Sequence, residues 1–436
     1  MTDGVASRGA IPACRFCGSG LSLTFVDLGM SPPSESFLRA DQIRMMEAFY
    51  PLHVFVCERC FLVQLEAFHA PEEIFDEYAY FSAYSTAWVE HARQYVEMIT
   101  GRLGLDSSSL VVELASNDGY LLQHFLGTGI PILGIEPAAN VAKAAQERGV
   151  PTDVSYFGVE TASRLVAEGK RASLILGNNV LAQVPDLNDF VGGVTTLLAQ
   201  DGTATFEFPH LMRLMEGLQY DTIYHEHFSY FSFATIVEIL AAHGLATYDV
   251  EELWTHGGSL RVYAQHADAP AEEAAAVAEL LAREEERGVR SPDAYRTFAE
   301  DVKESKRALL ELLITLRREG KHVVGYGAPG KGTTLLNYCG IRSDLLDYTV
   351  DRNPYKHGLF MPGTHVPIHE PERIAETRPD YILILPWNLA GEISGQLAET
   401  AEWGAKLIVP IPIATVFEPG SHPTAIESGE GVSRHS

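Results

Sequence analysis

Long apolar runs and basic residues are both scarce in this sequence. No uninterrupted apolar stretch approaches the roughly 20 residues of a membrane span, and the opening residues, MTDGVASRGAIPAC, lack the apolar core of a signal peptide. Only 32 Lys and Arg residues accompany 58 Asp and Glu, so the net charge is −26. Such an acidic chain repels a phosphate backbone. We therefore expect a cytoplasmic protein that binds neither membranes nor nucleic acid.

Cysteine is also rare, yet four of the five cysteines form two CxxC pairs, Cys14 with Cys17 and Cys57 with Cys60. In a reducing cytosol this pattern favours a metal over disulfides. A two-residue gap lets both thiolates of a pair face one ion, and four thiolates complete the tetrahedron of Zn²⁺. The loop between the pairs is longer than usual. With four protein ligands the zinc site would be closed and therefore structural.

The remainder of the chain alternates strand-like and helix-like segments, which predicts parallel sheets covered on both faces by helices. The first series of buried strands is expected at residues 108–114, 131–137, 172–178 and 202–208. The second series is expected at 321–327, 346–351, 380–386 and 405–412. The Ala- and Glu-rich stretch 270–288 between them reads as a solvated helix pair. The predicted fold class is α/β, with an N-terminal zinc-binding module and two Rossmann-like, doubly wound domains.

Polar residues follow consecutive strands of the first series, where ligands bind in open α/β sheets. The turn within VELASNDGYLLQHF (112–125) lies where a nucleotide-binding turn belongs, although it does not match GxGxxG. Glu136 ends the second strand and could accept hydrogen bonds from ribose hydroxyls; alone, it could equally cap the next helix. The order of these residues predicts a nucleoside site formed by Glu113, Ser116, Asn117, Gly119, Glu136, Asn178 and Asn179.

The segment YHEHFSYFS, residues 224–232, combines two histidines, a glutamate and two tyrosines in the loop after a sheet strand. Its polar half suits acid–base chemistry, because a histidine titrates near neutral pH. A metal site at His225 and His227 is an alternative, since alternate residues of an extended segment share a face. No third ligand is evident nearby, however. Spacing alone does not choose between the two histidines. The aromatic residues Phe228, Tyr230 and Phe231 suit core packing.

The loop GYGAPGKGTT, residues 325–334, follows a strand and satisfies GxGxxG, with Asp351 lying 21 residues after Gly330. This spacing would suit NAD. The loop also nearly matches a P-loop, but Gly332 stands where the hydroxyl that binds magnesium is required. Glycine amides at a helix N-terminus form an anion site in either case.

Seven motifs in order resemble the deoxysugar C-methyltransferases of bacterial antibiotic and cell-surface sugar pathways, which include the tetronitrose and mycarose C-3 methyltransferases. The motifs are CRFC…CERC, EYAYFSAYS, VELASNDGYLL, NNVLAQVPDLNDFV, YHEHFSYFS, THGGSLRVY and GYGAPGKGTTLLNYC. The resemblance extends to about residue 412. It implies a zinc module (1–75), an S-adenosylmethionine-binding methyltransferase domain (76–268) and a C-terminal domain that binds the nucleotide-sugar (269–415), with the active site between the last two. Residues 416–436 are expected to form a disordered tail.

The resemblance also implies the reaction. S-adenosylmethionine would methylate carbon 3 of a nucleotide-linked 4-keto-deoxysugar, usually a dTDP-sugar, after a base removes the proton from that carbon. His227 is the implied base, with Tyr224, Glu226 and either Tyr78 or Tyr80 as partners. The substrate contacts are expected at His256, Gly327, Lys331, Asn353 and Lys356. We expect a monomer that carries structural Zn²⁺.

One departure from the family is Gln183, which stands in AQVPD where the family is expected to have AHVPD. It leaves open a different sugar or a weaker cofactor contact. Two rival hypotheses also remain at this stage. One is an NAD-dependent nucleotide-sugar oxidoreductase that uses the C-terminal glycine loop. The other is a non-catalytic zinc scaffold. For His256 a turn at a strand edge, and for Asn353 and Lys356 ordinary turn chemistry, are the competing interpretations.

Overall fold

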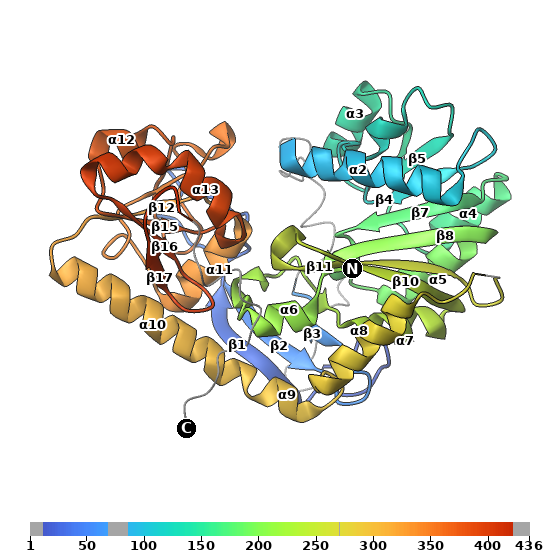
Figure 1. Cartoon of the computed structure of the whole chain (residues 1–436), viewed down its shortest axis with the longest axis horizontal. Helices are drawn as coiled ribbons and strands as arrows, with labels where there is room; N and C mark the ends of the chain where they lie inside the picture. The colour runs from blue at the N-terminus through green and yellow to red at the C-terminus, as the bar shows by residue number, and fades with distance from the viewer. Residues whose placement is uncertain (1–11, 69–85, 270, 422–436) are drawn as a thin grey trace. The chain divides into compact units, whose positions relative to one another are not determined.

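The computed structural model describes residues 12–68, 86–269 and 271–421 (Figure 1). The chain forms two compact units. The first unit comprises Met1–Ser22, Cys57–His210 and Phe228–Arg290, and the second comprises Leu23–Val56, Leu211–His227 and Ser291–Ser436. Tyr78 and Tyr80 lie outside the described residues, as does residue 422 onward of the expected tail. The domain boundaries expected from the sequence remain a prediction.

The first unit contains a seven-stranded sheet in the order β10-β11-β8-β7-β4-β5-β6. Its parallel strands are mostly buried and apolar, with β6 as the exception, and they are connected by helices or 3₁₀ turns. These strands are β4 (Val111–Leu114), β5 (Ile132–Ile135), β6 (Thr152–Asp153), β7 (Ala172–Asn178) and β8 (Leu198–Pro209). The helices are α2 (Thr86–Leu103), α3 (Ala139–Glu147), α4 (Val159–Ala167), α5 (Leu187–Leu197), α7 (Phe233–Ala242) and α8 (Ala275–Glu286), with short 3₁₀ turns at η2 (Leu122–Phe125) and η3 (Leu181–Gln183).

The expectation of a purely parallel sheet is wrong at one edge. Strands β10 (Leu245–Leu253) and β11 (Ser259–His266) form a hairpin, and β11 pairs antiparallel with β8. The connection between the two strands contains only the short turn η5 (Thr255–Gly257), which is too short for a parallel crossover. Near the cysteines, β3 (Val63–Leu65) pairs antiparallel with β9 (Ser229–Tyr230).

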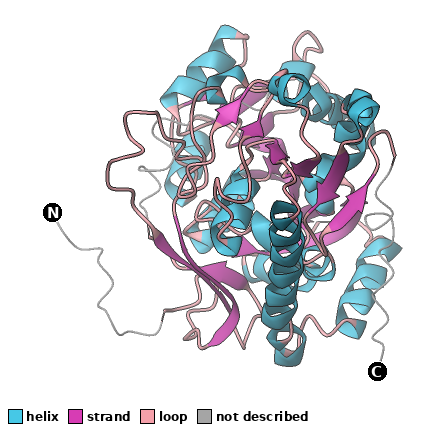
Figure 2. Cartoon of the chain, turned by 90° about the vertical axis from the view of Figure 1, so that its left-hand side faces the viewer, coloured by secondary structure: helices cyan, strands magenta, loops and turns pink. Residues whose placement is uncertain are grey.

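The second unit contains a six-stranded sheet in the order β14-β13-β12-β15-β16-β17, whose strands lie among helices (Figure 2). The strands are β12 (Val323–Tyr326), β13 (Thr349–Val350), β14 (Ile368–His369), β15 (Tyr381–Ile384), β16 (Lys406–Val409) and β17 (Thr415–Phe417). All neighbours are parallel except β16 and β17. The helices and turns are α6 (Leu211–Glu216), η4 (Tyr220–Thr222), α9 (Pro292–Arg296), α10 (Phe298–Arg318), α11 (Gly330–Cys339), η6 (Pro354–Lys356), α12 (Arg373–Thr377), η7 (Trp387–Leu389), α13 (Ala390–Gln396) and η8 (Ala398–Trp403).

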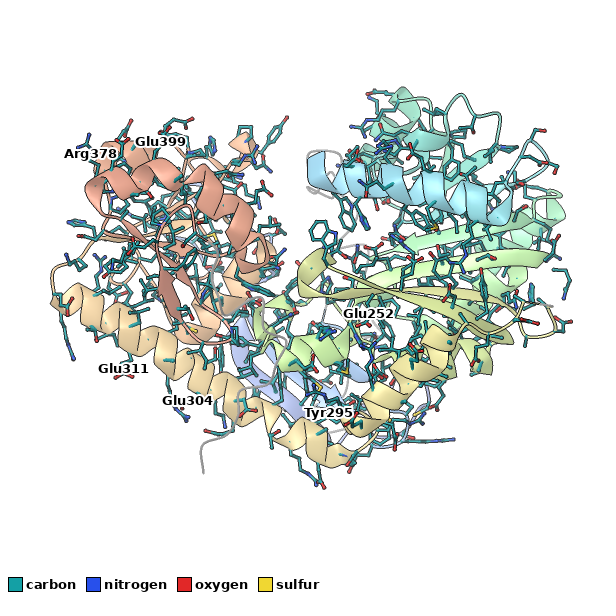
Figure 3. The ribbon with its side chains drawn as sticks, viewed as in Figure 1. Glu252, Tyr295, Glu304, Glu311, Arg378 and Glu399 are labelled. Atoms are coloured by element: carbon teal, nitrogen blue, oxygen red, sulfur yellow. The ribbon has the colours of Figure 1, made fainter. Side chains whose placement is uncertain are left out.

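The second unit also contains the hairpin of β1 (Leu23–Ser31) and β2 (Tyr50–Val56). Tyr295 of α9, labelled in Figure 3, packs edge-on against Phe25 of β1, with ring centroids 5.9 Å apart. Phe298 of α10 stacks on the same ring at 4.3 Å. Two sheets with crossover helices confirm the predicted α/β class. None of the helices in the described part of the chain combines the length and apolarity that a membrane span requires.

Helix α8 corrects the expectation that residues 270–288 are solvated. Glu284 of this helix is fully buried, and its carboxylate accepts the backbone N–H groups of Phe233 and Ala234, each at 2.7 Å. The Nε2 atom of His210 lies 2.6 Å from the same carboxylate. The carboxylate therefore stabilises the N-terminus of α7, in keeping with the helix dipole, and one face of α8 belongs to the core.

Candidate active site and zinc site

The four paired cysteines come together in the first unit. Their sulfur atoms all lie within 4.8 Å of one another, and no disulfide links them. Cys14 Sγ lies 3.6 Å from Cys60 Sγ, and Cys17 Sγ lies 3.5 Å from Cys57 Sγ. Four sulfurs bound at ~2.3 Å around one zinc ion stand about 3.8 Å apart. Gln64 donates a hydrogen bond to Cys14 Sγ. The donor set therefore fits a structural zinc ion.

The turn after β4 takes several positive backbone dihedral angles. Ala115, Asn117 and Gly119 have φ values of 52°, 50° and 77°. At Gly119 a Cβ would lie 3.0 Å from Val150 Cγ2, a tight contact that adds to the preference of this left-handed position for glycine. Ser116 is fully buried and donates its N–H to the carbonyl of Ile135 in the neighbouring strand. The turn is therefore compact and follows the carboxyl end of β4.

Three buried carboxylates surround this turn, at Glu113, Asp118 and Glu136. Burial raises the pKa of Glu113 well above its usual value, and the charges of Glu136 and Asp118 add to the effect. Glu113 Oε2 has no hydrogen-bond partner among the described residues. Burial also raises the pKa of Glu136. A cationic or hydroxyl-bearing ligand suits such a group of carboxylates, because an unpaired buried polar atom is costly.

Glu136 also accepts hydrogen bonds from the backbone around it. Its carboxylate accepts the N–H groups of Asn117 and Ala138, each at 2.9 Å. Glu136 is not the N-cap of α3, because that position is Ala138 and no side chain caps it; the ribose contact remains a prediction. Asn178 ends β7, and Asn179 has a φ of 55° and donates its N–H to Glu207 O in β8. Both asparagines therefore lie at the carboxyl edge of the sheet.

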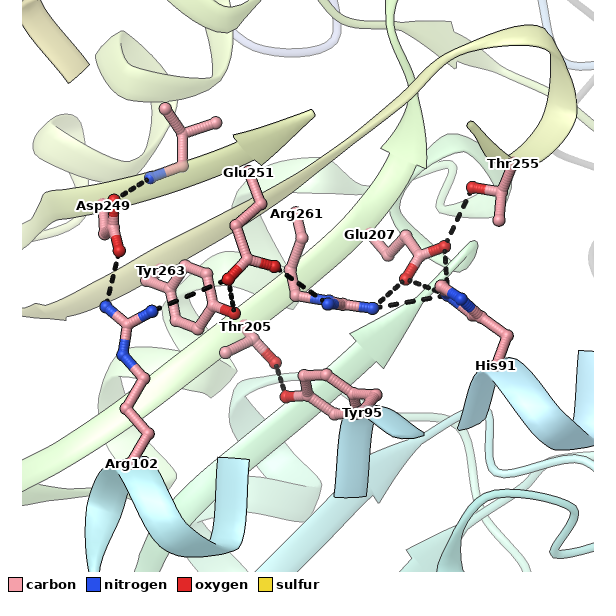
Figure 4. A network of polar contacts seen from close by, with 11 residues as sticks. His91, Tyr95, Arg102, Thr205, Glu207, Asp249, Glu251, Thr255, Arg261 and Tyr263 are labelled. Carbon is pink, nitrogen blue, oxygen red and sulfur yellow. Dashed lines mark hydrogen bonds and ion pairs between the residues drawn. The ribbon is translucent and has the colours of Figure 1, made fainter. Parts of the chain in front are cut away.

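Sequence reasoning missed a polar network that centres on Glu207 of β8 (Figure 4). This carboxylate is fully buried and lies 3.0 Å from His91 Nε2 of α2, 2.9 Å from Arg261 Nη2 of β11 and 3.1 Å from Thr255 Oγ1. Burial alone would raise the pKa of Glu207, but the hydrogen bond from His91 and the charge of Arg261 hold it below its usual value. The sequence offered one signal for this network: Glu207 is the single acidic residue in the apolar stretch TFEFP, residues 205–209.

The network supports the turn that carries His256. Thr255 bonds to Glu207, and His256 follows with a φ of 56°, a left-handed conformation that is uncommon for a residue other than glycine. The imidazole of His256 packs edge-on against Trp88 of α2, with centroids 5.3 Å apart. The turn interpretation of His256 is therefore present in the structure, and the substrate contact remains a prediction.

In the second unit the two histidines of YHEH differ in burial. His225 is buried, and its Nε2 atom lies 3.3 Å from Pro51 O. His227 is half-buried, and its Nδ1 atom lies 3.2 Å from Thr222 O. A carbonyl only accepts hydrogen bonds, so Nδ1 carries the proton and Nε2 carries the lone pair. This tautomer gives His227 the form that a general base needs.

Tyr224 and Glu226 flank that histidine. The ring of Tyr224 lies 4.1 Å from the ring of His227, centroid to centroid. Glu226 Oε1 accepts a hydrogen bond from Ser34 Oγ at 3.2 Å. Burial raises the pKa of Glu226, and the charge of Glu35 adds to the effect. Apart from the four cysteines, the described residues contain no cluster of His, Cys, Asp and Glu with metal-binding geometry, so no observation supports a metal at YHEH.

The glycine loop of the second unit is held by side chains on two neighbouring loops. Asp351 Oδ2 accepts the N–H of Ala328 at 2.6 Å, and Lys356 Nζ donates to Ala328 O at 2.8 Å. Gly327 has a φ of 88°, and a Cβ there would lie 2.5 Å from Pro386. Asn353 accepts the N–H of Tyr355. Asp351 is thus engaged with the backbone of the loop, as Glu136 is with the backbone of its own turn.

Lys331 at the start of α11 lies beside a buried carboxyl group. Its Nζ atom donates to Asn388 Oδ1 at 2.7 Å and sits 4.8 Å from the centre of the Trp387 ring. Trp387 in turn donates its Nε1–H to Asp221 at 2.7 Å. Burial raises the pKa of Asp221 to about 6, against the opposing charge of Lys331. The structure brings Gly327, Lys331, Asn353 and Lys356 to one region, while His256 belongs to the first unit.

Replacing Asp221 by asparagine is expected to change how stability depends on pH. The folded protein holds the Asp221 proton more tightly than the unfolded chain does, so wild-type stability falls as the pH rises from the usual pKa of 3.8 through about 6. Asp221→Asn removes this loss, and its stability relative to wild type should rise over the same interval by at most about 3 kcal/mol. Urea unfolding at several pH values measures the difference. Asp293→Asn, at an exposed position, is the control; equal pH dependence in the Asp221 variant would contradict the assignment.

Three family models match successive parts of the chain. Residues 14–75 match a zinc-binding domain family, residues 88–250 match a methyltransferase domain family, and residues 254–412 match the family described as the C-methyltransferase C-terminal domain. Among curated proteins, the C-methyltransferase NovU of Streptomyces niveus is 38% identical over 402 residues, which cover 92% of this chain and 96% of NovU.

Solved structures resemble part of the chain more distantly. The 1,6-didemethyltoxoflavin-N1-methyltransferase of Burkholderia thailandensis is 18% identical, with a TM-score of 0.33 over 48% of this chain and 95% of that protein. The magnesium protoporphyrin IX methyltransferase of Synechocystis is 15% identical, with a TM-score of 0.31 over 41% of this chain and 80% of that protein.

Proposed function

The chain belongs to the C-methyltransferase family of NovU, and on this premise we propose that it transfers a methyl group from S-adenosylmethionine to carbon 3 of a nucleotide-linked 4-keto-deoxysugar. The nucleotide in this proposal is dTDP. The observation that supports it most is the 38% identity with a C-methyltransferase across 92% of the chain. A non-catalytic zinc scaffold would not account for that extent of similarity.

The chemistry requires a base, because carbon 3 is not nucleophilic until it loses a proton. A ketone at carbon 4 makes this proton acidic by delocalising the resulting charge onto oxygen. His227 supplies the base, since its Nδ1–H is directed at Thr222 O and its Nε2 carries the lone pair. Tyr224 supplies a hydroxyl that can donate to the developing enolate oxygen. Glu226, with its raised pKa, is suited to share the proton.

The first unit supplies the residues for the cofactor. S-adenosylmethionine provides an electrophilic methyl group on a sulfonium cation. The carboxylates of Glu113 and Glu136 lie at the ends of adjacent parallel strands, where they can meet a cation and the ribose hydroxyls. Structural Zn²⁺ on the four cysteines completes the cofactors.

Replacing Glu136 by glutamine is expected to weaken binding of S-adenosylhomocysteine by about 10- to 100-fold, because hydrogen bonds to a charged group contribute about 1.5–3 kcal/mol. Isothermal titration calorimetry measures the affinity. Glu160→Gln, at an exposed position of α4, is the matched control and should bind as wild type does. Unchanged affinity in a folded Glu136→Gln protein would remove Glu136 from the proposed site.

Calorimetry also tests the function itself. We expect wild-type protein to bind S-adenosylhomocysteine and to show no heat with NAD. Binding of NAD alone would instead support the nucleotide-sugar oxidoreductase and would contradict the proposal. A monomeric state and a cytoplasmic location belong to the same proposal; the first is tested by size-exclusion chromatography with light scattering, and the second by cell fractionation.

A further inference from the structure

Arg15 lies inside the first CxxC pair and reaches three other segments of the first unit. Its backbone N–H donates to Gln64 Oε1 at 2.9 Å, and its Nη1 atom donates to Pro185 O at 3.1 Å. Its Nη2 atom donates to Leu65 O. The guanidinium also lies over the ring of Phe228, with Cζ 5.3 Å from the ring centre. One side chain thus joins the zinc knuckle, meaning residues 14–17 and 57–65, to two distant loops.

Both of these loops adjoin proposed site residues. Pro185 lies in the segment between β7 and α5, which begins with Asn179 directly after Asn178 and contains η3 with Gln183. Phe228 follows His227 directly in the chain. The N–H of Phe228 donates to Ala182 O at 2.6 Å, so the two loops are also bonded to each other.

The knuckle reinforces the same contacts from its own backbone. Leu65 donates its N–H to Phe228 O at 3.0 Å, next to the pairing of β3 with β9. Asn188 of α5 donates to the carbonyl oxygens of Arg15 and Phe16 at 3.2 and 3.0 Å. Hydrogen bonds therefore run in both directions. Arg15 and Leu65 donate to carbonyl oxygens of Pro185 and Phe228, and Asn188 donates to carbonyl oxygens of the knuckle.

The chemistry of the guanidinium explains why arginine suits this position. Its planar fork presents several fixed N–H donors, so it can bond to two carbonyls while its face rests on an aromatic ring. Lysine has one compact charge on a flexible stem and does not reproduce all three contacts. A residue that served only to fill space near the zinc would not need donors directed at Leu65 O and Pro185 O.

We propose that Arg15 is a positioning residue for methyl transfer, which holds loop 181–186 and Phe228 in register with the zinc knuckle. This inference rests on the proposed function, because the loops matter through Asn178, Asn179 and His227. Zinc then serves catalysis as well as stability. The knuckle that it closes fixes loop 181–186, which follows Asn178 and Asn179, and it fixes Phe228, which follows His227.

Arg15→Lys and Arg15→Ala test this role, with Arg59→Ala as the control, since Arg59 is the arginine between the cysteines of the second CxxC pair and is exposed. We expect both Arg15 variants to retain the zinc content of the wild type. Their kcat should fall by about 10- to 100-fold, the loss expected when a reacting group is misplaced. Added guanidinium ion should restore part of kcat in Arg15→Ala, which a merely structural defect would not allow.

Hydrogen–deuterium exchange provides a readout that does not depend on activity. Amides in 181–186 and 228–231 should exchange faster in the Arg15 variants, whereas Arg59→Ala should match the wild type. Wild-type kcat and loop exchange in Arg15→Ala would overturn the inference, and so would loss of zinc from both variants. Failure of the proposed function has a different signature, because wild-type protein itself would then transfer no methyl group.

Discussion

Replacing His227 by asparagine is expected to reduce the rate of methyl transfer by about 10²–10⁴-fold, the usual contribution of a positioned general base. Asparagine has no ring nitrogen with a lone pair, so it cannot remove the proton from carbon 3. The affinity for S-adenosylhomocysteine should remain unchanged, because the proposed cofactor residues lie at or just after the carboxyl ends of strands β4, β5 and β7. Initial rates and calorimetry on the same preparation measure the two effects.

A second readout isolates the proton-transfer step. Wild-type enzyme incubated with the keto-sugar in D₂O and S-adenosylhomocysteine should exchange the hydrogen on carbon 3, and His227→Asn should not. His225→Asn is the matched variant: it loses the bond to Pro51 O, so we expect lower thermal stability but exchange by the folded fraction. Exchange that disappears in His225→Asn and persists in His227→Asn would show that the histidines have been assigned the wrong way round.

Replacing Cys17 by serine is expected to abolish zinc binding and to unfold much of the first unit. Structural zinc sites contribute about 10–16 kcal/mol in small zinc-finger peptides, which equals or exceeds the ~5–15 kcal/mol total stability of a typical domain. Here the knuckle also bonds to α5 and to the loop after β7, so the loss should extend beyond the cysteines. Metal analysis and thermal unfolding, with and without a chelator, measure the effect.

The fifth cysteine provides the control for that experiment. Cys339 is buried in the second unit, with its Sγ 3.7 Å from the Tyr220 hydroxyl, and it has no place in the four-sulfur cluster. Cys339→Ala should therefore keep its zinc. If Cys17→Ser retained zinc and the wild-type melting temperature, the four cysteines would not form the proposed site.

Much of the fold could be predicted from local patterns. The buried strands of both sheets are short runs of apolar residues between turn residues, and such runs specify strands with little help from distant contacts. The zinc cluster could also be predicted, because two CxxC pairs encode their own ligand geometry. The hairpin of β10 and β11 was missed, since an apolar run does not reveal the direction in which a strand pairs.

The candidate site was harder to predict, because the role of several residues depends on contacts with residues that are distant in the sequence. His225 and His227 have equivalent spacing, and each has one ring nitrogen beside a backbone carbonyl; only their burial, nearly complete at His225 and partial at His227, separates them. The role of Glu207 likewise depends on His91 and Arg261, which are distant in sequence. Arg15 resembles any charged residue of a knuckle until Pro185 and Phe228 are placed beside it.

The central claim is most directly tested by locating the transferred methyl group. Wild-type enzyme should be incubated with a dTDP-4-keto-deoxysugar and S-adenosylmethionine that carries a ¹³C-labelled methyl, and the product analysed by NMR. We predict a labelled methyl bonded to carbon 3 of the sugar. A labelled methyl on oxygen, or conversion of the sugar only when NAD is supplied, would contradict the account.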